Sequence, residues 1–261
     1  MEFNAIRHTI WGLPGYGFFT GVGFVVSTCV FIVLLSRKHF PVEVDLRILF
    51  ASFIFLLLFA RGFGILSALF RYVAERKPLS WEILSEGGIV FFGGLIGLLL
   101  AFHIISRAKK TDKDTIHVLA VCIPLFHAFA RVGCFFGGCC FGKESTCILS
   151  IEYTTLIDGV TVTAQRIPIQ LFEAVFNLSL FLYLLFLIAR PNWRERLLLH
   201  QYLFFYSFGR FILEFYRGDS VRGVAFGISF SQIICMIVLL LEIARFVTIK
   251  KRKTKREEFG L

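Results

Sequence analysis

The sequence predicts an all-α, polytopic membrane protein with seven transmembrane helices around a lipid-accessible cavity. Of its 261 residues, 57% are hydrophobic and 33 are phenylalanine, and the mean hydropathy is +0.76, which excludes a soluble domain of this length. Seven windows are long and apolar enough for a spanning helix, which needs roughly 20 residues. Arginines inside three of these windows predict a buried polar site.

The windows follow one another with short connections. They lie near 15–36, 47–70, 87–106, 115–135, 168–189, 199–216 and 224–247. The exception is 136–167, which is rich in Gly, Cys, Thr and Ser and is too polar from Lys143 onward to span a bilayer. We expect a partly ordered extracytoplasmic loop there. Residues 1–248 are thus predicted to form one membrane domain, and 249–261 a basic cytoplasmic tail.

The basic residues of the loops predict the orientation, because cytoplasmic loops carry the excess of Lys and Arg. With the N-terminus outside, 17 basic residues fall on the cytoplasmic side and 8 on the outer side. The outer set is Arg7, Arg71, Arg76, Lys77, Lys143, Arg166, Arg217 and Arg222. Seven spans and a cytoplasmic C-terminus fit this division. The net charge of +10 then reflects topology and a tail that binds anionic membrane lipids, not nucleic acid. No cleaved signal peptide is expected.

The intramembrane arginines are Arg61, Arg131 and Arg210. Each costs a few kcal/mol or more in lipid, so each is expected to face a protein interior, a wet cavity or an anionic partner. Arg131 lies where a helix meets the glycine-rich run ARVGCFFGGCCFGK, 130–143. Unpaired backbone N–H groups and a planar guanidinium together favour phosphate binding there. Arg131 is therefore a candidate ligand of a lipid phosphate.

Two further polar stripes are predicted to face the same cavity. Tyr206, Arg210, Glu214 and Arg217 lie at i, i+4, i+8 and i+11, on one helical face. Glu214 is expected to pair with one of the neighbouring arginines and so to lower the cost of burial. Gln170, Glu173 and Asn177 form the second stripe, at i, i+3 and i+7.

Gly93 and Gly94, with Gly97 one turn later, form a groove that could accept another helix or a lipid.

His127 precedes Arg131 by four residues, and we weigh it as a general base against a structural hydrogen-bonding role. Tyr16 near the predicted outer surface either binds a lipid head group or anchors the helix at the interface.

Several of these pieces, in this order, resemble the prolipoprotein diacylglyceryl transferase family. The similar segments are Tyr16-Gly17, Arg61-Gly62, GGLIG at 93–97, the run 130–142 that ends in Gly142, PIQLFE at 168–173, and the run from Tyr206 to Arg217. The family transfers a diacylglyceryl group from phosphatidylglycerol to the lipobox cysteine of prolipoprotein signal peptides in the bacterial cytoplasmic (inner) membrane. The resemblance implies Arg131 and Arg210 as catalytic groups that hold the phosphate, and no cofactor.

Four positions depart from the family pattern. Phe92 stands where the family often has a His before the Gly-Gly pair, Cys134 and Cys139 where the signature has Asn and Glu, and Ile167 where the family has a His. Each change removes a polar group near the expected site. Either the family's chemistry does not require these groups, or this member acts on an altered substrate, and the sequence leaves open whether the acceptor is the general lipoprotein pool or one dedicated substrate.

Cysteines gather beside the outer surface, where Cys134, Cys139, Cys140 and Cys147 fall within fourteen residues. Disulfides that staple this loop are expected, because zinc sites usually show pairs of cysteines two to four residues apart. The cluster leaves open a membrane thiol-disulfide oxidoreductase. A lipid-binding carrier that releases no glycerol phosphate is the other alternative.

Overall fold

The structure is a computed structural model of residues 1–261. The structure describes residues 2–5, 9–78, 80–86, 88–157, 159–219, 224–225 and 227–258. Arg7 and Arg222, two of the predicted outer basic residues, and the last three residues of the predicted tail lie outside this described part.

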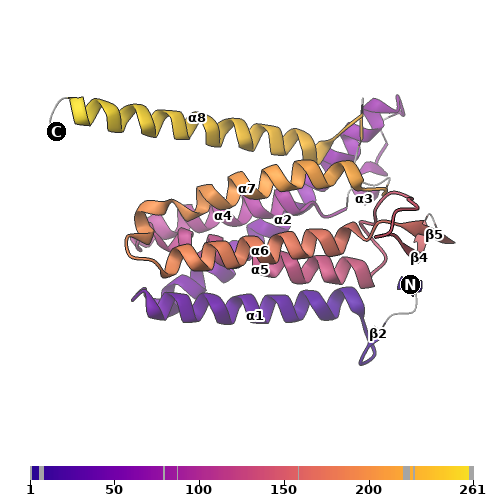
Figure 1. Ribbon diagram of the computed structural model, residues 1–261, viewed down its shortest axis with the longest axis horizontal. Coiled ribbons are helices and arrows are strands. Elements are labelled where there is room, and N and C mark those ends of the chain that lie inside the picture. The colour runs from indigo at the N-terminus through magenta and orange to yellow at the C-terminus, as the bar shows by residue number, and fades with distance from the viewer. Residues whose placement is uncertain are drawn as a thin grey trace.

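The fold is a bundle of long helices that lie side by side (Figure 1). Among the described residues, six helices are long and apolar enough to cross a membrane. They are α1 (Gly15–Arg37), α2 (Val42–Ala74), α4 (Phe91–Ala108), α5 (Thr115–Phe136), α6 (Ile169–Ala189) and the Phe230–Ile249 part of α8 (Phe230–Glu258). The prediction of a mostly helical, multi-pass protein is therefore confirmed.

The remaining predicted span is shorter than expected. Helix α7 (Leu198–Leu213) has 16 residues and continues as the 3-10 helix η3 (Glu214–Tyr216). It packs between α6 and α8 along the bundle (Figure 1). The chain tightens into η3 at Glu214, whose carboxylate is held by a neighbouring arginine, so the predicted window 199–216 is not one continuous α-helix.

Helix α5 lies at the centre of the bundle and packs against α1, α6 and α7. Of its apolar window 78% is buried, compared with 17% for the window of α8. Helix α8 leans away from the bundle along its length (Figure 1) and continues to Glu258, through most of the predicted tail. A polar residue on α5 is thus surrounded by protein, whereas much of α8 faces outward.

Helix α4 approaches α2 closely because glycines form its contact face. A Cβ at Gly93 would lie 2.4 Å from the Phe59 carbonyl oxygen, and one at Gly97 would lie 2.5 Å from that of Phe55. A Cβ at Gly94 would meet the Ala60 Cβ at 3.4 Å. The GGLIG run therefore packs α4 on α2, so the predicted groove accepts another helix.

Both ends of the bundle are built from the predicted loops. At one end, the segment 136–167 folds into an antiparallel hairpin, β4 (Ile151–Ile157) and β5 (Val160–Arg166), and β1 (Glu2–Asn4) adds parallel to β4. The hairpin is more ordered than the predicted loop. Its alternating Thr and Val residues in VTVTAQR are typical of a strand. Short pieces complete this end: α3 (Ile83–Glu86), β2 (Thr9–Ile10), β3 (Leu13–Pro14), β6 (Val224–Ala225) and β7 (Ile228–Ser229).

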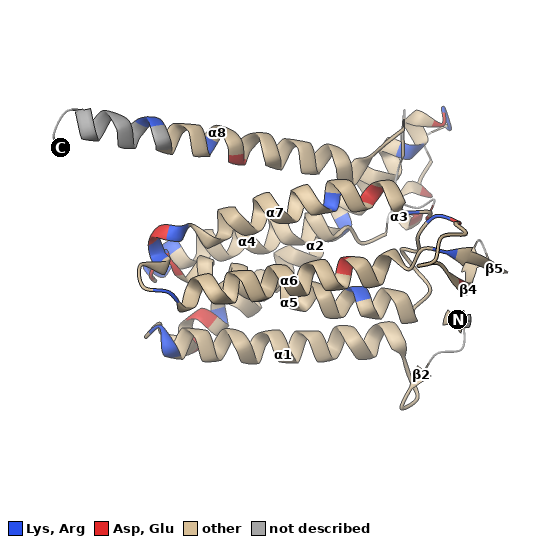
Figure 2. Cartoon of the chain, in the orientation of Figure 1, with Lys and Arg blue, Asp and Glu red and all other residues tan. Residues whose placement is uncertain are grey.

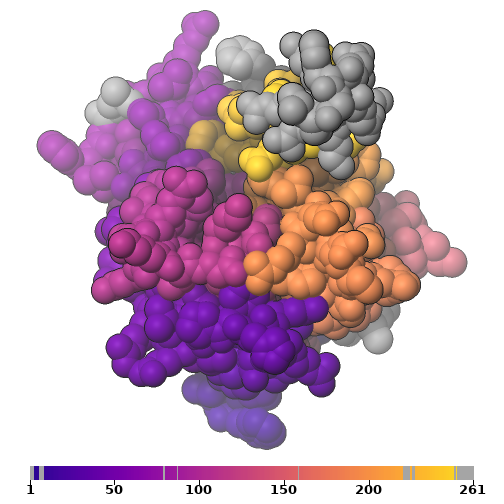
Figure 3. Space-filling view, turned by 90° about the vertical axis from the view of Figure 1, so that its left-hand side faces the viewer, coloured from indigo at the N-terminus to yellow at the C-terminus, as the bar shows by residue number. Residues whose placement is uncertain are grey.

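At the other end, basic residues gather in and beside the loops (Figure 2). Arg194 of the 3-10 helix η2 (Trp193–Arg196) reaches Asp112 at 2.9 Å and Asp114 at 3.0 Å, and the Lys38 ammonium lies 5.4 Å from the centre of the Trp193 ring. Figure 3 looks onto this end, where the segments before α5 and α7 lie side by side above α1. These contacts join three of the loops that the charge pattern assigns to one side of the membrane.

Candidate active site

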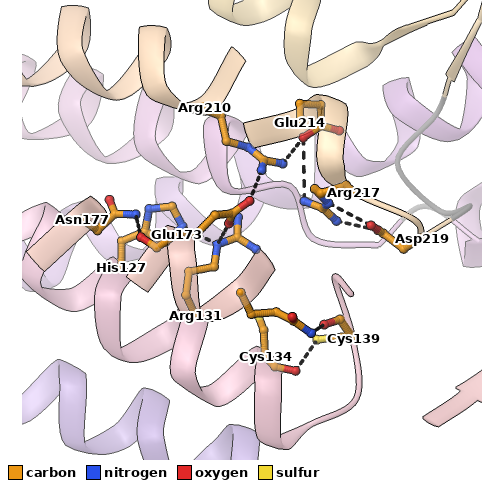
Figure 4. A network of polar contacts seen from close by, with 11 residues as sticks. His127, Arg131, Cys134, Cys139, Glu173, Asn177, Arg210, Glu214, Arg217 and Asp219 are labelled. Carbon is orange, nitrogen blue, oxygen red and sulfur yellow. Dashed lines mark hydrogen bonds and ion pairs between the residues drawn. The ribbon is translucent and has the colours of Figure 1, made fainter. Parts of the chain in front are cut away.

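Residues far apart in the sequence meet in a buried network of ion pairs at the C-terminal end of α5 (Figure 4). The Arg131 Nε of α5 lies 2.5 Å from Oε2 of Glu173 on α6. The other oxygen of Glu173 pairs with Nη1 of Arg210 on α7. All three side chains are at least nine-tenths buried. One carboxylate therefore joins the two arginines that the sequence predicted to hold a phosphate.

The network continues along the C-terminal end of α7. Arg210 also pairs with Glu214, and Nη1 of Arg217 lies 4.0 Å from Glu214. Arg217 then makes a two-pronged pair with Asp219, with Nε to Oδ1 at 2.8 Å and Nη2 to Oδ2 at 2.5 Å. The predicted pairing of Glu214 with its neighbouring arginines is confirmed.

Cations and anions alternate through the network, three of each. This alternation offsets the cost of removing each charge from water. The prediction of a protein interior or an anionic partner is confirmed for Arg131 and Arg210, whose partners here are carboxylates. A phosphate that binds to Arg131 or Arg210 must therefore share or replace a carboxylate.

His127 lies one turn before Arg131 on α5 and is 2% exposed. Its Nε2 accepts a hydrogen bond from Arg131 Nε at 3.1 Å, so the ring is neutral with its proton on Nδ1. The Phe91 ring stacks on it, with centroids 3.8 Å apart. The Nε2 lone pair of His127 is directed at the Arg131 guanidinium. This contact corresponds to the structural hydrogen-bonding role, which was weighed against a role as general base.

Other predicted residues frame the network. Tyr206 is 1% exposed, and its ring centre lies 5.4 Å from those of His127 and Phe92. Asn177 Nδ2 donates to the backbone oxygen of Glu173 at 2.7 Å. Gln170 Nε2 donates to the backbone oxygen of Cys139 at 2.9 Å. The predicted stripe on α6 thus faces the site, partly through backbone groups.

Two predicted residues stand apart. The Arg61 guanidinium donates to the Leu84 backbone oxygen of α3, and no ion pair among the described residues joins it to the network. Tyr16 is 47% exposed at the start of α1. A Cβ added at Gly137 would lie 2.9 Å from the Cβ of Tyr16. Tyr16 therefore lies against the end of α5, at the edge of the site.

Gly142 links the loop after α5 to the arginine network. It forms a β-bridge with Arg217, and Lys143 N donates to the Tyr216 oxygen at 2.9 Å. A Cβ at Gly142 would lie 2.1 Å from the Ile167 carbonyl oxygen, so only glycine fits. The loop and the chain around Arg217 thus form one clamped unit.

Sequence reasoning missed two residues here. Asp219 follows Arg217 by two residues, and this adjacency of opposite charges was the available signal. Lys143 lines a pocket that reaches the network at Glu214, together with Phe215, Val224, Gly227, Ser229 and Gln232. Lys143 is the basic residue of this lining.

All seven cysteines lie within the described residues and are free, so the expected disulfides of the loop are absent there. Cys147 is exposed and its sulfur contacts Ser150 Oγ at 3.3 Å, whereas the sulfurs of Cys134, Cys139 and Cys140 lie within 4.8 Å of one another. Hydrogen bonds from the Cys134 and Cys139 thiols hold the pKa of Cys140 well below its usual value, and the charges of Arg217 and Arg131 lower it further.

Comparisons with known proteins show the family to which the chain is similar. Residues 6–248 match the family model described as prolipoprotein diacylglyceryl transferase. A phosphatidylglycerol–prolipoprotein diacylglyceryl transferase of Helicobacter pylori (strain J99) is 31% identical in an alignment of length 285. The alignment covers 98% of this chain and 97% of the relative. The enzyme named phosphatidylglycerol–prolipoprotein diacylglyceryl transferase 2 of Clostridium perfringens (strain 13) is 28% identical, with coverage of 95% and 96%. This chain therefore belongs to the prolipoprotein diacylglyceryl transferase family.

Proposed function

We propose that the protein transfers the diacylglyceryl group of phosphatidylglycerol to the lipobox cysteine of prolipoprotein signal peptides. The buried network of Arg131, Glu173 and Arg210 carries the proposal, within a chain that belongs to the family along most of its length. The relatives' names supply the two substrates.

In this reaction the acceptor sulfur attacks the glyceryl carbon that bears the phosphate. A C–S bond forms, the C–O bond to phosphate breaks, and the electron pair stays on the oxygen of glycerol phosphate. Negative charge therefore grows on the leaving oxygen. Arg131 and Arg210 would bind it, because fixed guanidinium groups in a site of low dielectric stabilise such charge strongly.

The lipid phosphate would enter by exchange with a carboxylate. Arg210 has two carboxylate partners, Glu173 and Glu214, so it keeps one when the phosphate displaces the other. The pocket that Lys143 and Gln232 line beside Glu214 offers an approach for the head group. Gly142 and Arg217 would hold this side of the site closed behind it.

The site is proposed to open toward the outer leaflet of a bacterial cytoplasmic membrane. With α7 as a short seventh span, the N-terminus would lie outside and the C-terminus in the cytoplasm. The basic loops gathered at the opposite end of the bundle support this orientation (Figure 2). Residues 1–248 then form the membrane domain, and 249–261 the cytoplasmic end of the chain.

The test is glycerol phosphate release by the purified protein from labelled phosphatidylglycerol, with a lipobox peptide and a matched peptide in which the cysteine is alanine. Release that depends on the cysteine supports the transferase. Lipid binding without release would indicate a carrier. Peptide oxidation without release would indicate a thiol-disulfide oxidoreductase.

A further inference from the structure

The turn after α5 brings three cysteine sulfurs to one point. Cys134 lies in the last turns of α5, and Cys139 and Cys140 follow the helix end, with the three Sγ atoms within 4.8 Å of one another. Gly138 (φ +70°) and Cys140 (φ +56°) adopt left-handed backbone conformations that reverse the chain. Such a conformation is strained for a non-glycine residue, and it is what points Cys140 back toward the other two.

Buried polar side chains fix the backbone of this turn from several sides. Thr155 Oγ1 donates to the Gly138 oxygen at 2.6 Å, and the Tyr153 hydroxyl donates to the Phe135 oxygen at 2.5 Å. Gln170 donates to the Cys139 oxygen, and among the described residues its buried Oε1 has no hydrogen-bond partner. The three sulfurs are thus held in place by groups from β4 and α6.

This geometry matches a thiolate metal site. Zinc–sulfur bonds of about 2.3 Å in a tetrahedron place the ligand sulfurs roughly 3.8 Å apart, so small shifts within the turn are sufficient. Soft thiolates select zinc among the common divalent ions. The sequence spacing argued against zinc because Cys134 and Cys139 are five residues apart, but the glycine turn closes that gap.

Only three metal-binding side chains belong to this group within the described part of the chain. Structural zinc sites use four protein ligands, whereas catalytic sites use three and leave one position open. Arg131 lies one turn before Cys134 on α5, and the Gly142–Arg217 bridge follows Cys140 by two residues. The three sulfurs therefore lie near the proposed phosphate ligand Arg131.

We propose that Cys134, Cys139 and Cys140 bind one zinc ion, whose open position binds the acceptor cysteine as a thiolate. This inference rests on the proposed transferase function for the identity of the acceptor. It supplies an activating group that the arginine network lacks, since the His127 lone pair is directed at Arg131 and Phe92 is apolar. Zinc coordination deprotonates a thiol at neutral pH.

The step balances without a redox partner. The acceptor thiol binds zinc and gives its proton to solvent, and the bound sulfur then attacks the glyceryl carbon. One C–S bond forms, one C–O bond breaks, and glycerol phosphate leaves with the bonding pair. The thioether product is a weaker ligand than a thiolate, so it leaves the metal.

The first test measures metal in the reduced protein, purified in detergent and equilibrated with Zn²⁺ alone. We expect about one zinc per chain by elemental mass spectrometry. Replacement by Co²⁺ should give the sulfur-to-cobalt absorption and intense visible bands of a tetrahedral thiolate site. Cys134→Ser, Cys139→Ser and Cys140→Ser should each weaken zinc binding at least tenfold.

Cys147→Ser and Cys235→Ser are matched controls and should keep the full zinc content. Size-exclusion profiles identify any variant that fails to fold, and Gln170→Leu provides a variant that keeps all three sulfurs but should still lower zinc affinity. Absence of zinc from folded, reduced wild-type protein overturns the proposal, and so does a disulfide within the trio that persists under mild reduction.

Adding the transfer assay separates the two proposals. Zinc binding with no transfer to the lipobox peptide leaves the metal site standing and removes the transferase. Transfer that continues at full rate after complete removal of zinc leaves the transferase standing and removes the metal site. Both proposals require transfer that is lost with zinc and restored by adding it.

Discussion

At the scale of single residues, the site depends on carboxylates that satisfy buried arginines. The sequence indicated that Arg131 and Arg210 are functional because an arginine inside an apolar window is costly. It did not indicate that one carboxylate, Glu173, binds both, because residues on three different helices have no fixed relation in the sequence. Helical periodicity predicted the local pairing of Glu214, which lies one turn from Arg210.

Glu173→Gln should lower the free energy of unfolding more than the same substitution at an exposed glutamate. It leaves the buried guanidinium groups of Arg131 and Arg210 without their shared anion, and breaking a buried pair costs about 3 kcal/mol or more. Thermal unfolding in detergent measures the loss. Glu144→Gln, which removes the exposed partner of Arg166, is the control and should cost under about 1 kcal/mol. Equal effects of the two substitutions would contradict this account of the network.

Arg131→Lys and Arg210→Lys should each lower transfer at least about a hundredfold, because an ammonium cannot replace a planar fork that contacts two partners. The corresponding alanine variants should abolish transfer. Arg194→Lys, at the opposite end of the bundle, keeps its charge near Asp112 and should leave the rate unchanged. Near wild-type transfer by either buried variant would remove the proposed phosphate ligands.

At the scale of elements, apolar windows predicted the long helices well and the polar end poorly. The window near 87–106 corresponds to α4, and 115–135 to α5. The hairpin of β4 and β5 was not predicted, because its pairing depends on contacts across segment 136–167. The sequence indicated a cluster of four cysteines, but not that Cys134, Cys139 and Cys140 meet without Cys147, because the left-handed conformations at Gly138 and Cys140 cannot be deduced from linear spacing.

Gly93→Ala should weaken the packing of α4 on α2. The added Cβ would meet the Phe59 carbonyl oxygen at 2.4 Å, so the helices must separate, at a cost of about 1 to 3 kcal/mol. Gly62→Ala is the matched control, because a Cβ there meets no atom within 4 Å among those described. The thermal midpoints of the two variants in detergent provide the comparison. A lower midpoint for the Gly62 variant than for the Gly93 variant would contradict the packing described.

At the scale of the whole molecule, the two ends of the bundle differ in kind. One end carries the hairpin, the ion-pair network and the cysteine trio, and the other carries basic loops joined by contacts such as Arg194 to Asp112. The numbers of Lys and Arg residues in the loops predicted which loops lie on the same side of the membrane. The structure brings the N-terminal ends of α5 and α7 together at the basic end, which supports the same division.

The proposed orientation predicts which end reacts with a membrane-impermeant maleimide on intact cells. Cys139 and Cys147 are exposed between α5 and β4 and should be labelled from outside, whereas the double substitution Cys139→Ser with Cys147→Ser should remove that signal. Lys38→Cys in this double-substituted background should react only after the membrane is permeabilised. The reverse pattern would require the N-terminus to be cytoplasmic.

The most direct measurement of the central claim is mass spectrometry of a lipobox peptide after incubation with the purified protein and phosphatidylglycerol of defined acyl chains. We expect a product heavier by the diacylglyceryl group, with the added mass on the cysteine sulfur and an equal amount of glycerol phosphate. The Arg210→Ala variant should form none of this product. Unmodified peptide, recovered with folded wild-type protein and zinc present, would contradict the assignment of this site to diacylglyceryl transfer.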